Sequence, residues 1–174
     1  MTYIQTAGRN YVDLSDPHPD QIDIEDIAHG LANTCRWVGH TPHFYSVAEH
    51  SLLCCDNADA VHALEALLHD AAEAYIGDVS TPLKAMLGSV YTDIEHRIDG
   101  VIRAKYGLPK YETAVVKRID QSLLTLELQD IMRVTTTCRD VPRPLTGRVR
   151  YYPPEIAKRA FLSRFYHLQG LCHA

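Results

Sequence analysis

The sequence lacks the features of a membrane protein and of a general nucleic-acid binder. No stretch approaches the 18 consecutive apolar residues of a membrane-spanning helix. The first residues carry neither the basic start nor the apolar run of a secretory signal. The formal charge of −5 has the wrong sign for sequence-independent binding to a phosphate backbone, which needs a cationic surface. We therefore expect no membrane and no polymeric nucleic acid as partners, while a small basic pocket for one phosphorylated molecule is compatible with this charge.

Cysteine is scarce and irregularly placed. The 174 residues hold five cysteines, an odd number, of which two are adjacent and none belongs to a Cys-x-x-Cys pair. This pattern argues against a disulfide scaffold and against a structural zinc ribbon. We therefore expect reduced thiols and a cytoplasmic protein.

Strand signals are confined to the start of the chain, where a small hairpin is predicted over 3–14. Helix signals follow. The first predicted helix begins behind a cap at Asp23 and ends at Gly39, the second begins with a capping box at Ser46–Glu49, and the third begins behind a cap at Asp59. Thr81 is the predicted cap of the next helix, with Pro82 as its first helical residue. Further helices are predicted over about 89–106, 110–133 and 154–169. Six or seven helices with short connections predict an all-α bundle, with no room for a βαβ sheet.

One polar pair interrupts an apolar helix segment. His69 and Asp70 follow two leucines, and Glu73 lies one turn further along the same face. Burying an imidazole beside a carboxylate costs free energy unless something satisfies both groups, and a divalent cation does so directly. The pair alone fits an ordinary polar helix end better than a metal site.

Two further residues strengthen the metal interpretation. His50 lies in the first turn of its predicted helix and, taken alone, is more typical of a surface histidine. Asp120 falls among aliphatic residues at helical spacing, where it needs either a cation or a hydrogen-bond partner; a buried salt bridge to an arginine is the alternative. With His69 and Asp70, these residues lie on three separate predicted helices.

The order His50, His69-Asp70, Asp120 resembles the H…HD…D signature of the HD-domain phosphohydrolase superfamily. The resemblance extends to five short motifs: Arg36-Trp37, Ser46–Ser51, Leu68–Glu73, Gly77-Asp78 and Thr81–Lys84. Together these look like the 5′-deoxynucleotidase branch and the small phage and bacterial deoxynucleoside triphosphate hydrolases. The resemblance covers roughly residues 24–130, the expected core of a single HD domain spanning 1–174. The combination of motifs is specific, whereas no single motif is.

The resemblance implies one divalent metal ion (Co, Mn, Zn or Mg) bound by His50, His69, Asp70 and Asp120. Such an ion polarises phosphate and lowers the pKa of the attacking water. The resemblance also implies two acids that handle protons: Glu73 as hydrogen-bond partner or general base for that water, and Asp78 as orienting group or proton donor to the leaving oxygen. It implies that Arg36 binds phosphate and that Trp37 packs on the sugar or base. The nucleotide side of the pocket would be lined by Thr81, Pro82 and Lys84. The alternatives are a core tryptophan, a turn aspartate and a solvated lysine.

The function that the resemblance implies is metal-dependent hydrolysis at the α-phosphate of a deoxynucleotide. One reaction is that of a 5′-deoxynucleotidase, and the other releases triphosphate from a deoxynucleoside triphosphate, as a dATPase does. A nucleotide-binding protein without turnover and a cyclic-nucleotide phosphodiesterase are weaker alternatives. The resemblance also implies a homo-oligomer. A late loop carries four arginines that either contact phosphate or are merely solvated: Arg139, Arg143, Arg148 and Arg150.

Overall fold

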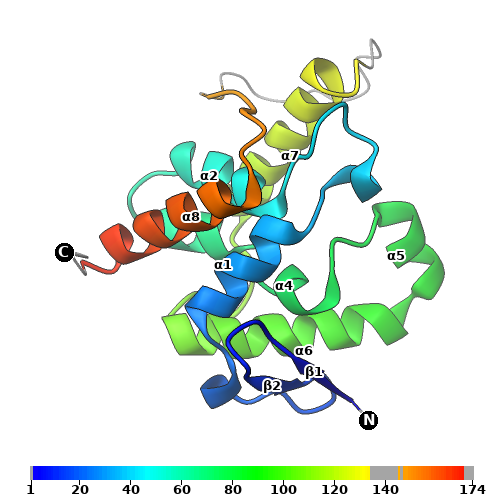
Figure 1. The fold of residues 1–174 in the computed structure, drawn as a ribbon, viewed down its shortest axis with the longest axis vertical. Helices are drawn as coiled ribbons and strands as arrows, with labels where there is room; N and C mark the ends of the chain where they lie inside the picture. Colours follow the sequence, from blue (N-terminus) through cyan, green and yellow to red (C-terminus); the bar gives the residue numbers. More distant parts are fainter. Residues whose placement is uncertain (1, 134–144, 146, 171–174) are drawn as a thin grey trace.

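Helices make up nearly all the regular structure in the computed structural model, which describes residues 2–133, 145 and 147–170. The elements are β1 (Tyr3–Gln5), β2 (Tyr11–Asp13), the 3-10 turn η1 (Pro19–Gln21), α1 (Ile24–Asn33), the 3-10 turn η2 (Trp37–Gly39), α2 (Val47–Asp56), α3 (Ala63–Leu68), α4 (Glu73–Ile76), α5 (Thr81–Leu87), α6 (Ser89–Tyr106), α7 (Ala114–Asp130) and α8 (Pro154–Leu168). The predicted all-α fold with a small N-terminal hairpin is confirmed (Figure 1).

The hairpin is attached to the first turn of α1 by one carboxylate. β1 and β2 pair antiparallel with Ile4 opposite Val12. The carboxylate of Asp26 accepts hydrogen bonds from the Gly8 N–H at 2.6 Å, the Thr6 hydroxyl at 2.6 Å and the Asn10 amide at 2.8 Å. The hairpin turn is thereby held against α1.

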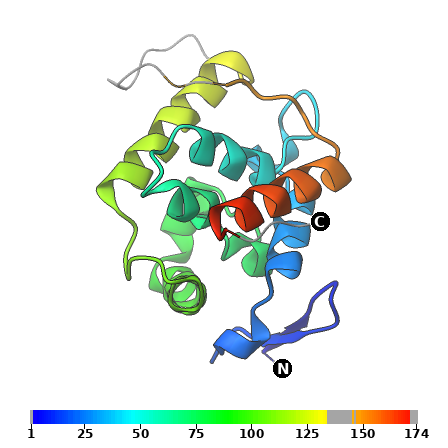
Figure 2. The same cartoon turned by 90° about the vertical axis from the view of Figure 1, so that its left-hand side faces the viewer.

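The main core surrounds α1, which packs against α2, α4 and α8. Figures 1 and 2 show α8 lying over α1 and α2, with α7 on the other side of α2. Three apolar residues of α8 complete this core: Ala157, Phe161 and Phe165. A smaller cluster joins α2, α3 and α7 through Leu53, Cys54, Ala66, Val116 and Leu123. This second cluster fixes α2 and α7, which carry His50 and Asp120, and α3, which His69 directly follows.

The predicted helix through His69 and Asp70 is not continuous, and this expectation is corrected. α3 ends at Leu68 and α4 begins at Glu73. Between them the backbone is wound more tightly, with the Glu73 N–H donating to the Asp70 carbonyl at 2.9 Å. The reason is local: Nδ1 of His69 bonds to the Ala66 carbonyl at 2.9 Å, the group that an α-helix would pair with the Asp70 N–H. Because residues three apart eclipse in such turns, Asp70 and Glu73 lie on one side.

Four helix boundaries also differ from the sequence expectation. α3 begins at Ala63 with His62 in the cap position, because the Asp59 carboxylate accepts from the His62 N–H at 3.0 Å in a turn that precedes the helix. α1 ends at Asn33, well before Gly39, because the chain turns to form a β-bridge between Cys35 and Ser46. α7 begins at Ala114 behind a Thr113 cap, and Ser80 takes the cap position of α5 that Thr81 was expected to take.

The predicted capping box at the start of α2 forms only in part. The Ser46 hydroxyl accepts from the Glu49 N–H at 3.2 Å, as expected. The Glu49 carboxylate does not reach back, because it accepts from the backbone N–H groups of Tyr151 at 3.1 Å and Tyr152 at 2.8 Å. Glu49 thus ties the segment before α8 to α2.

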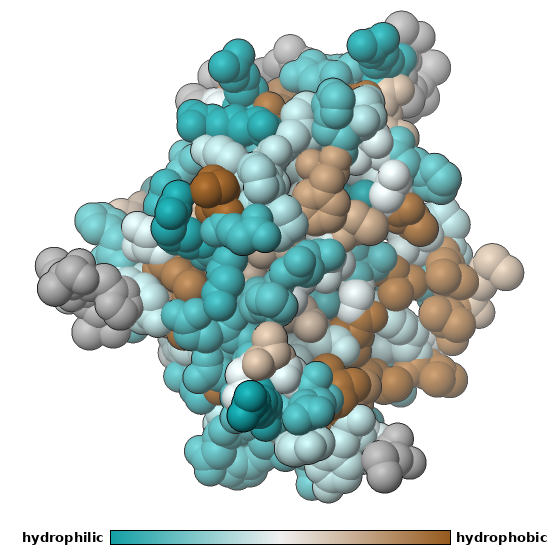
Figure 3. Space-filling view, in the orientation of Figure 1, coloured by the Kyte–Doolittle hydropathy of each residue, from teal (hydrophilic) through white to brown (hydrophobic). Residues whose placement is uncertain are grey.

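Apolar residues also gather on one part of the surface. Figure 3 shows them over α5 and the start of α6, where Leu83, Met86, Leu87 and Val90 are 45–84% exposed. Of the helices in the described part of the chain, none is both long enough and apolar enough to cross a membrane.

Candidate metal centre and adjacent pocket

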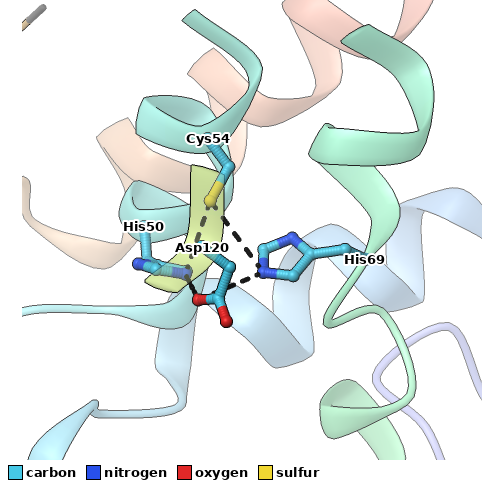
Figure 4. A group of neighbouring side chains, drawn as sticks. All are labelled: His50, Cys54, His69 and Asp120. Carbon is cyan, nitrogen blue, oxygen red and sulfur yellow. Dashed lines mark hydrogen bonds and ion pairs between the residues drawn. The ribbon is translucent and has the colours of Figure 1, made fainter. Parts of the chain in front are cut away.

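Three of the expected metal ligands converge from three helices. His50 lies in the first turn of α2, His69 directly follows α3, and Asp120 lies in α7. The Oδ1 atom of Asp120 is 3.1 Å from Nε2 of His50 and 3.9 Å from Nε2 of His69. Figure 4 shows both imidazole rings and the carboxylate pointing toward one another. The structure therefore brings together side chains that are up to 70 residues apart in sequence.

Two more donors border the same space. The Oδ2 atom of Asp70 is 3.1 Å from Nε2 of His69 and 3.8 Å from Nε2 of His50. Cys54, one turn after His50, places its sulfur 3.5 Å from Nε2 of His50 and 3.9 Å from Nε2 of His69. Sequence reasoning missed Cys54, although its position four residues after a candidate ligand on one helix face was a usable signal.

The buried group of His50, Cys54, His69 and Asp120 could hold a metal ion. Nitrogen and oxygen donors bound at about 2.0–2.2 Å to one ion lie roughly 3–3.5 Å from their neighbours. Among the two histidines, Asp70 and Asp120, the four separations between an imidazole nitrogen and a carboxylate oxygen run from 3.1 to 3.9 Å. The residues present therefore fit a divalent ion with only small side-chain movements.

The far nitrogen of each imidazole has its own partner. Nδ1 of His50 lies 2.7 Å from Oε1 of Glu127, and Nδ1 of His69 lies 2.9 Å from the Ala66 carbonyl. Both partners are acceptors, so each Nδ1 carries a proton, and in the neutral ring that a metal ion requires the Nε2 lone pair would face the cluster. Such backing groups are typical of metal-bound histidines.

The cluster attracts positive charge. Burial opposes protonation of both imidazoles, yet Cys54 and the nearby carboxylates outweigh it and raise the pKa of His50 and His69 well above the ordinary value. Burial likewise opposes ionisation of Asp70, but the histidines lower its pKa to about 2. Ionised carboxylates that face imidazole nitrogens are an environment that a divalent cation satisfies.

Glu127 is a buried hub that sequence reasoning missed. Its carboxylate pairs with the Arg36 guanidinium at 3.0 Å and accepts from Trp37 Nε1 at 3.0 Å and from the Tyr45 hydroxyl at 2.7 Å, in addition to His50. Burial opposes its ionisation, but Arg36 and His50 lower its pKa to about 2. Its spacing of seven residues from Asp120, two helical turns along the same face, was the available signal.

A cavity of about 510 Å³ opens beside the cluster. Its walls include every auxiliary residue expected from the sequence: Arg36, Trp37, Glu73, Asp78, Thr81, Pro82 and Lys84. Asp70 and Asp120 line it as well, so the candidate metal ligands form part of the wall. Its volume lies within the range of roughly 300–1,000 Å³ typical of small-molecule sites.

The two cations of this cavity are partly neutralised by neighbours. Arg36, whose side chain is 10% exposed, pairs with Glu127 and keeps Nη1 3.7 Å from Oδ2 of Asp70. The Lys84 ammonium lies 2.7 Å from Oε1 of Glu95 and 3.7 Å from Oε1 of Glu73. Each cation is therefore held at a fixed place on the wall.

The backbone at the mouth of the cavity is strained. Trp37 and Val38 have φ values of 56° and 52°, in the left-handed region that favours glycine. Each such residue costs of order 1–3 kcal/mol, and such strain clusters at functional sites. The bond from Trp37 Nε1 to Glu127 fixes the indole in this conformation.

Glu73 is the least satisfied acid of the site. Its side chain is 8% exposed, and Oε2 has no hydrogen-bond partner within the described part of the chain. Burial, followed by the charges of Asp70 and Asp78, raises its pKa well above the ordinary value. Burial also raises the pKa of Asp78. Two acids with raised pKa values thus face the same cavity.

Only two of the four arginines of the loop before α8 lie within the described residues. Arg139 and Arg143 lie outside the described residues. Arg148 and Arg150 line a separate cavity of about 480 Å³ with Arg164 of α8. None of the metal-ligand candidates lines this cavity, and neither Arg148 nor Arg150 lines the 510 Å³ cavity beside them.

Two relatives place the chain among known sequences. YfdR from Escherichia coli (strain K12) is 44% identical over 131 residues, which cover 75% of this chain and 73% of YfdR. This chain belongs to the YfdR family. The protein RCAP_rcc00048 from Rhodobacter capsulatus is 37% identical over 182 aligned positions, covering 93% of this chain and 92% of that protein. Both relatives are named as uncharacterized proteins, and no family model matches the chain.

Proposed function

We propose that this member of the YfdR family is a metal-dependent phosphohydrolase that releases phosphate from deoxynucleoside 5′-monophosphates. The observation that carries the proposal is the convergence of His50, His69, Asp70 and Asp120 beside a 510 Å³ cavity that also holds two cations and a tryptophan. The resemblance to HD-domain phosphohydrolases supports the same reaction and supplies the preference for deoxynucleotides.

The four ligand candidates would hold one divalent ion. When bound, that ion supplies Lewis acidity toward a phosphate oxygen and lowers the pKa of water. We assign Arg36 to a phosphate oxygen; in support, Nη1 lies beside Asp70 while Nε and Nη2 are held by Glu127. Glu127 therefore positions both Arg36 and His50, and it links the phosphate side of the site to the metal side.

Proton transfer is assigned to the two acids with raised pKa values. Glu73 lies one tight turn from Asp70, with Oε2 free to accept a hydrogen bond from the attacking water. Asp78, whose protonated form is favoured by burial, is suited to donate a proton to the leaving sugar oxygen. Lys84 stays close to Glu73 and offsets negative charge that develops on the cavity wall.

The charge of the cavity favours a monophosphate over a triphosphate. Its described lining residues include four carboxylates, Asp70, Glu73, Asp78 and Asp120, but only two cations, Arg36 and Lys84. Both cations are already paired, Arg36 with Glu127 and Lys84 with Glu95. The described wall therefore offers little counter-charge for a β- or γ-phosphate beyond the one phosphate assigned to Arg36.

Another part of the wall suits a nucleoside. Trp37, Val38, Leu124 and Leu128 give it an apolar and aromatic character, and an indole is a group against which a sugar or base can pack. Thr81 contributes a hydroxyl that can hydrogen-bond a polar edge. This combination of an apolar wall with few polar groups is typical of small-molecule sites.

The test is product analysis on protein loaded with Mn²⁺, Co²⁺ or Zn²⁺ and incubated separately with dAMP and dATP. We expect inorganic phosphate and deoxyadenosine from dAMP, and little product from dATP. Release of intact triphosphate from dATP as the main reaction would replace the proposed substrate with the alternative one. Absence of hydrolysis of both nucleotides with every metal would overturn the proposal.

A pair of matched variants ties the activity to the site. Asp70→Asn removes one ligand charge with little change in volume, and we expect it to lower phosphate release by at least about 100-fold. Asp56→Asn alters an aspartate at the end of α2, whose partner is Arg164 at 2.5 Å, and serves as the control. Equal activity of the two variants would remove Asp70 from the proposed mechanism.

A further inference from the structure

The thiol of Cys54 lies inside the candidate metal centre and on its core side. Its side chain is fully buried with Leu53, Ala66 and Val116, whereas Asp70 and Asp120 line the open cavity. The hydrogen-bond contacts recorded for the sulfur are with Nε2 of His50 and Nε2 of His69. The thiol therefore faces the nitrogens that a metal ion would bind, from the core rather than from the substrate cavity.

The sulfur–nitrogen separations match those of a shared metal ion. Zinc binds thiolate sulfur at about 2.3 Å and imidazole nitrogen at about 2.0–2.1 Å, so tetrahedral angles place the two donors about 3.5 Å apart. The sulfur of Cys54 is 3.5 Å from Nε2 of His50 and 3.9 Å from Nε2 of His69. Asp120 completes four donors that lie within 4.8 Å of one another. Contact of the sulfur with two imidazole nitrogens is not required for apolar packing, and it is what a shared metal ion requires.

We infer that Cys54 is a thiolate ligand of the metal ion and that its sulfur makes the centre prefer Zn²⁺ or Co²⁺ to Mg²⁺ or Mn²⁺. When the ion binds, the S–H proton leaves to solvent and a sulfur–metal bond forms, with no change in oxidation state. Soft thiolate donors favour these ions, whereas Mg²⁺ and Mn²⁺ prefer oxygen. The inference rests on the metal site of the proposed function but not on hydrolysis.

The neighbouring Cys55 provides a matched control. It lies on the same helix and is also buried, with 4% of its surface exposed. Its sulfur contacts Nη1 of Arg164 at 3.3 Å, on the side that faces α8. A serine at Cys55 makes the same chemical change one residue away from the centre.

The experiment compares wild type, Cys54→Ser and Cys55→Ser after loading with Co²⁺ under reducing conditions. We expect the near-ultraviolet thiolate-to-cobalt charge-transfer band in wild type and in Cys55→Ser, and its loss in Cys54→Ser. Competition titrations should show Zn²⁺ affinity at least about 10-fold weaker in Cys54→Ser, with Mn²⁺ affinity changed by less than about 3-fold.

X-ray absorption at the zinc edge of wild-type protein removes any dependence on the folding of the variants. We expect a sulfur shell at about 2.3 Å. Nitrogen and oxygen neighbours alone, or a charge-transfer band that survives in Cys54→Ser, would overturn the inference. If the sulfur shell is present but no nucleotide is hydrolysed, the proposed function fails while Cys54 stands as a ligand.

Discussion

Glu127→Gln is the substitution whose effect the structure specifies most fully. The carboxylate accepts hydrogen bonds on both oxygens: Arg36 and Trp37 use Oε2, while Tyr45 and His50 use Oε1. A glutamine of nearly the same volume has one acceptor oxygen and one donor NH₂ group. Whichever way the amide turns, it places a donor against donors and leaves Arg36 without its buried counter-charge.

The magnitude follows from this loss. Removing one partner of a buried ion pair costs about 3–5 kcal/mol. In a domain of this size each kcal/mol lowers Tm by roughly 2–4 °C, so we expect a decrease of roughly 6–20 °C. Because Glu127 also holds Nδ1 of His50, we expect metal affinity to fall by about 10- to 100-fold.

The assay is thermal unfolding followed by circular dichroism on metal-free protein, with Glu25→Gln as control. Glu25 lies 3.0 Å from the Lys158 ammonium, but its side chain is 53% exposed. Exposed pairs contribute about 0–1 kcal/mol, so the control should lower Tm by no more than about 4 °C. Equal Tm values for the two variants would refute the description of Glu127 as a buried hub.

Three further outcomes are expected. Gly30→Ala should destabilise the protein by about 1–3 kcal/mol in urea unfolding, because the added Cβ would lie 2.8 Å from the Ala74 carbonyl oxygen; a neutral effect would contradict the α1–α4 packing. Gly100→Ala, with nothing within 4 Å of the added Cβ on α6, should instead stabilise by about 0.5–1 kcal/mol, and a loss would contradict its exposed position. Zn²⁺ at 100 times its Kd should stabilise wild-type protein against unfolding by about 2.7 kcal/mol, and excess chelator should reverse this effect. Asp120→Asn should weaken the stabilisation by Zn²⁺; equal stabilisation of the two proteins would mean that the ion binds elsewhere.

The fold could be predicted largely because its signals are local. Asp23 caps α1 through the Glu25 N–H at 2.7 Å, as its position before an apolar periodic segment indicates. α6 spans Ser89–Tyr106, within the predicted bounds, because Gly107 takes the left-handed conformation that ends it. The break after Leu68 could not be predicted, because it depends on a contact between the His69 ring and the Ala66 carbonyl.

The candidate site could be predicted where polar residues interrupt apolar patterns. His69, Asp70 and Asp120 do so, and the structure brings them together. Cys54 was missed because cysteine fits an apolar helix face as well as a metal site. Glu127 was missed because a glutamate near the end of a helix usually faces solvent. Its burial depends on partners that are distant in sequence, such as Arg36, which lies 91 residues earlier in the chain.

The most direct test of the account is a crystal structure of zinc-loaded protein with a deoxynucleoside 5′-monophosphate, with the ion located by anomalous scattering. The account predicts one zinc peak bounded by Nε2 of His50, Nε2 of His69, the sulfur of Cys54 and the carboxylates of Asp70 and Asp120, with the phosphate beside Arg36. Zinc bound away from these side chains, or a nucleotide bound outside this cavity, would contradict it.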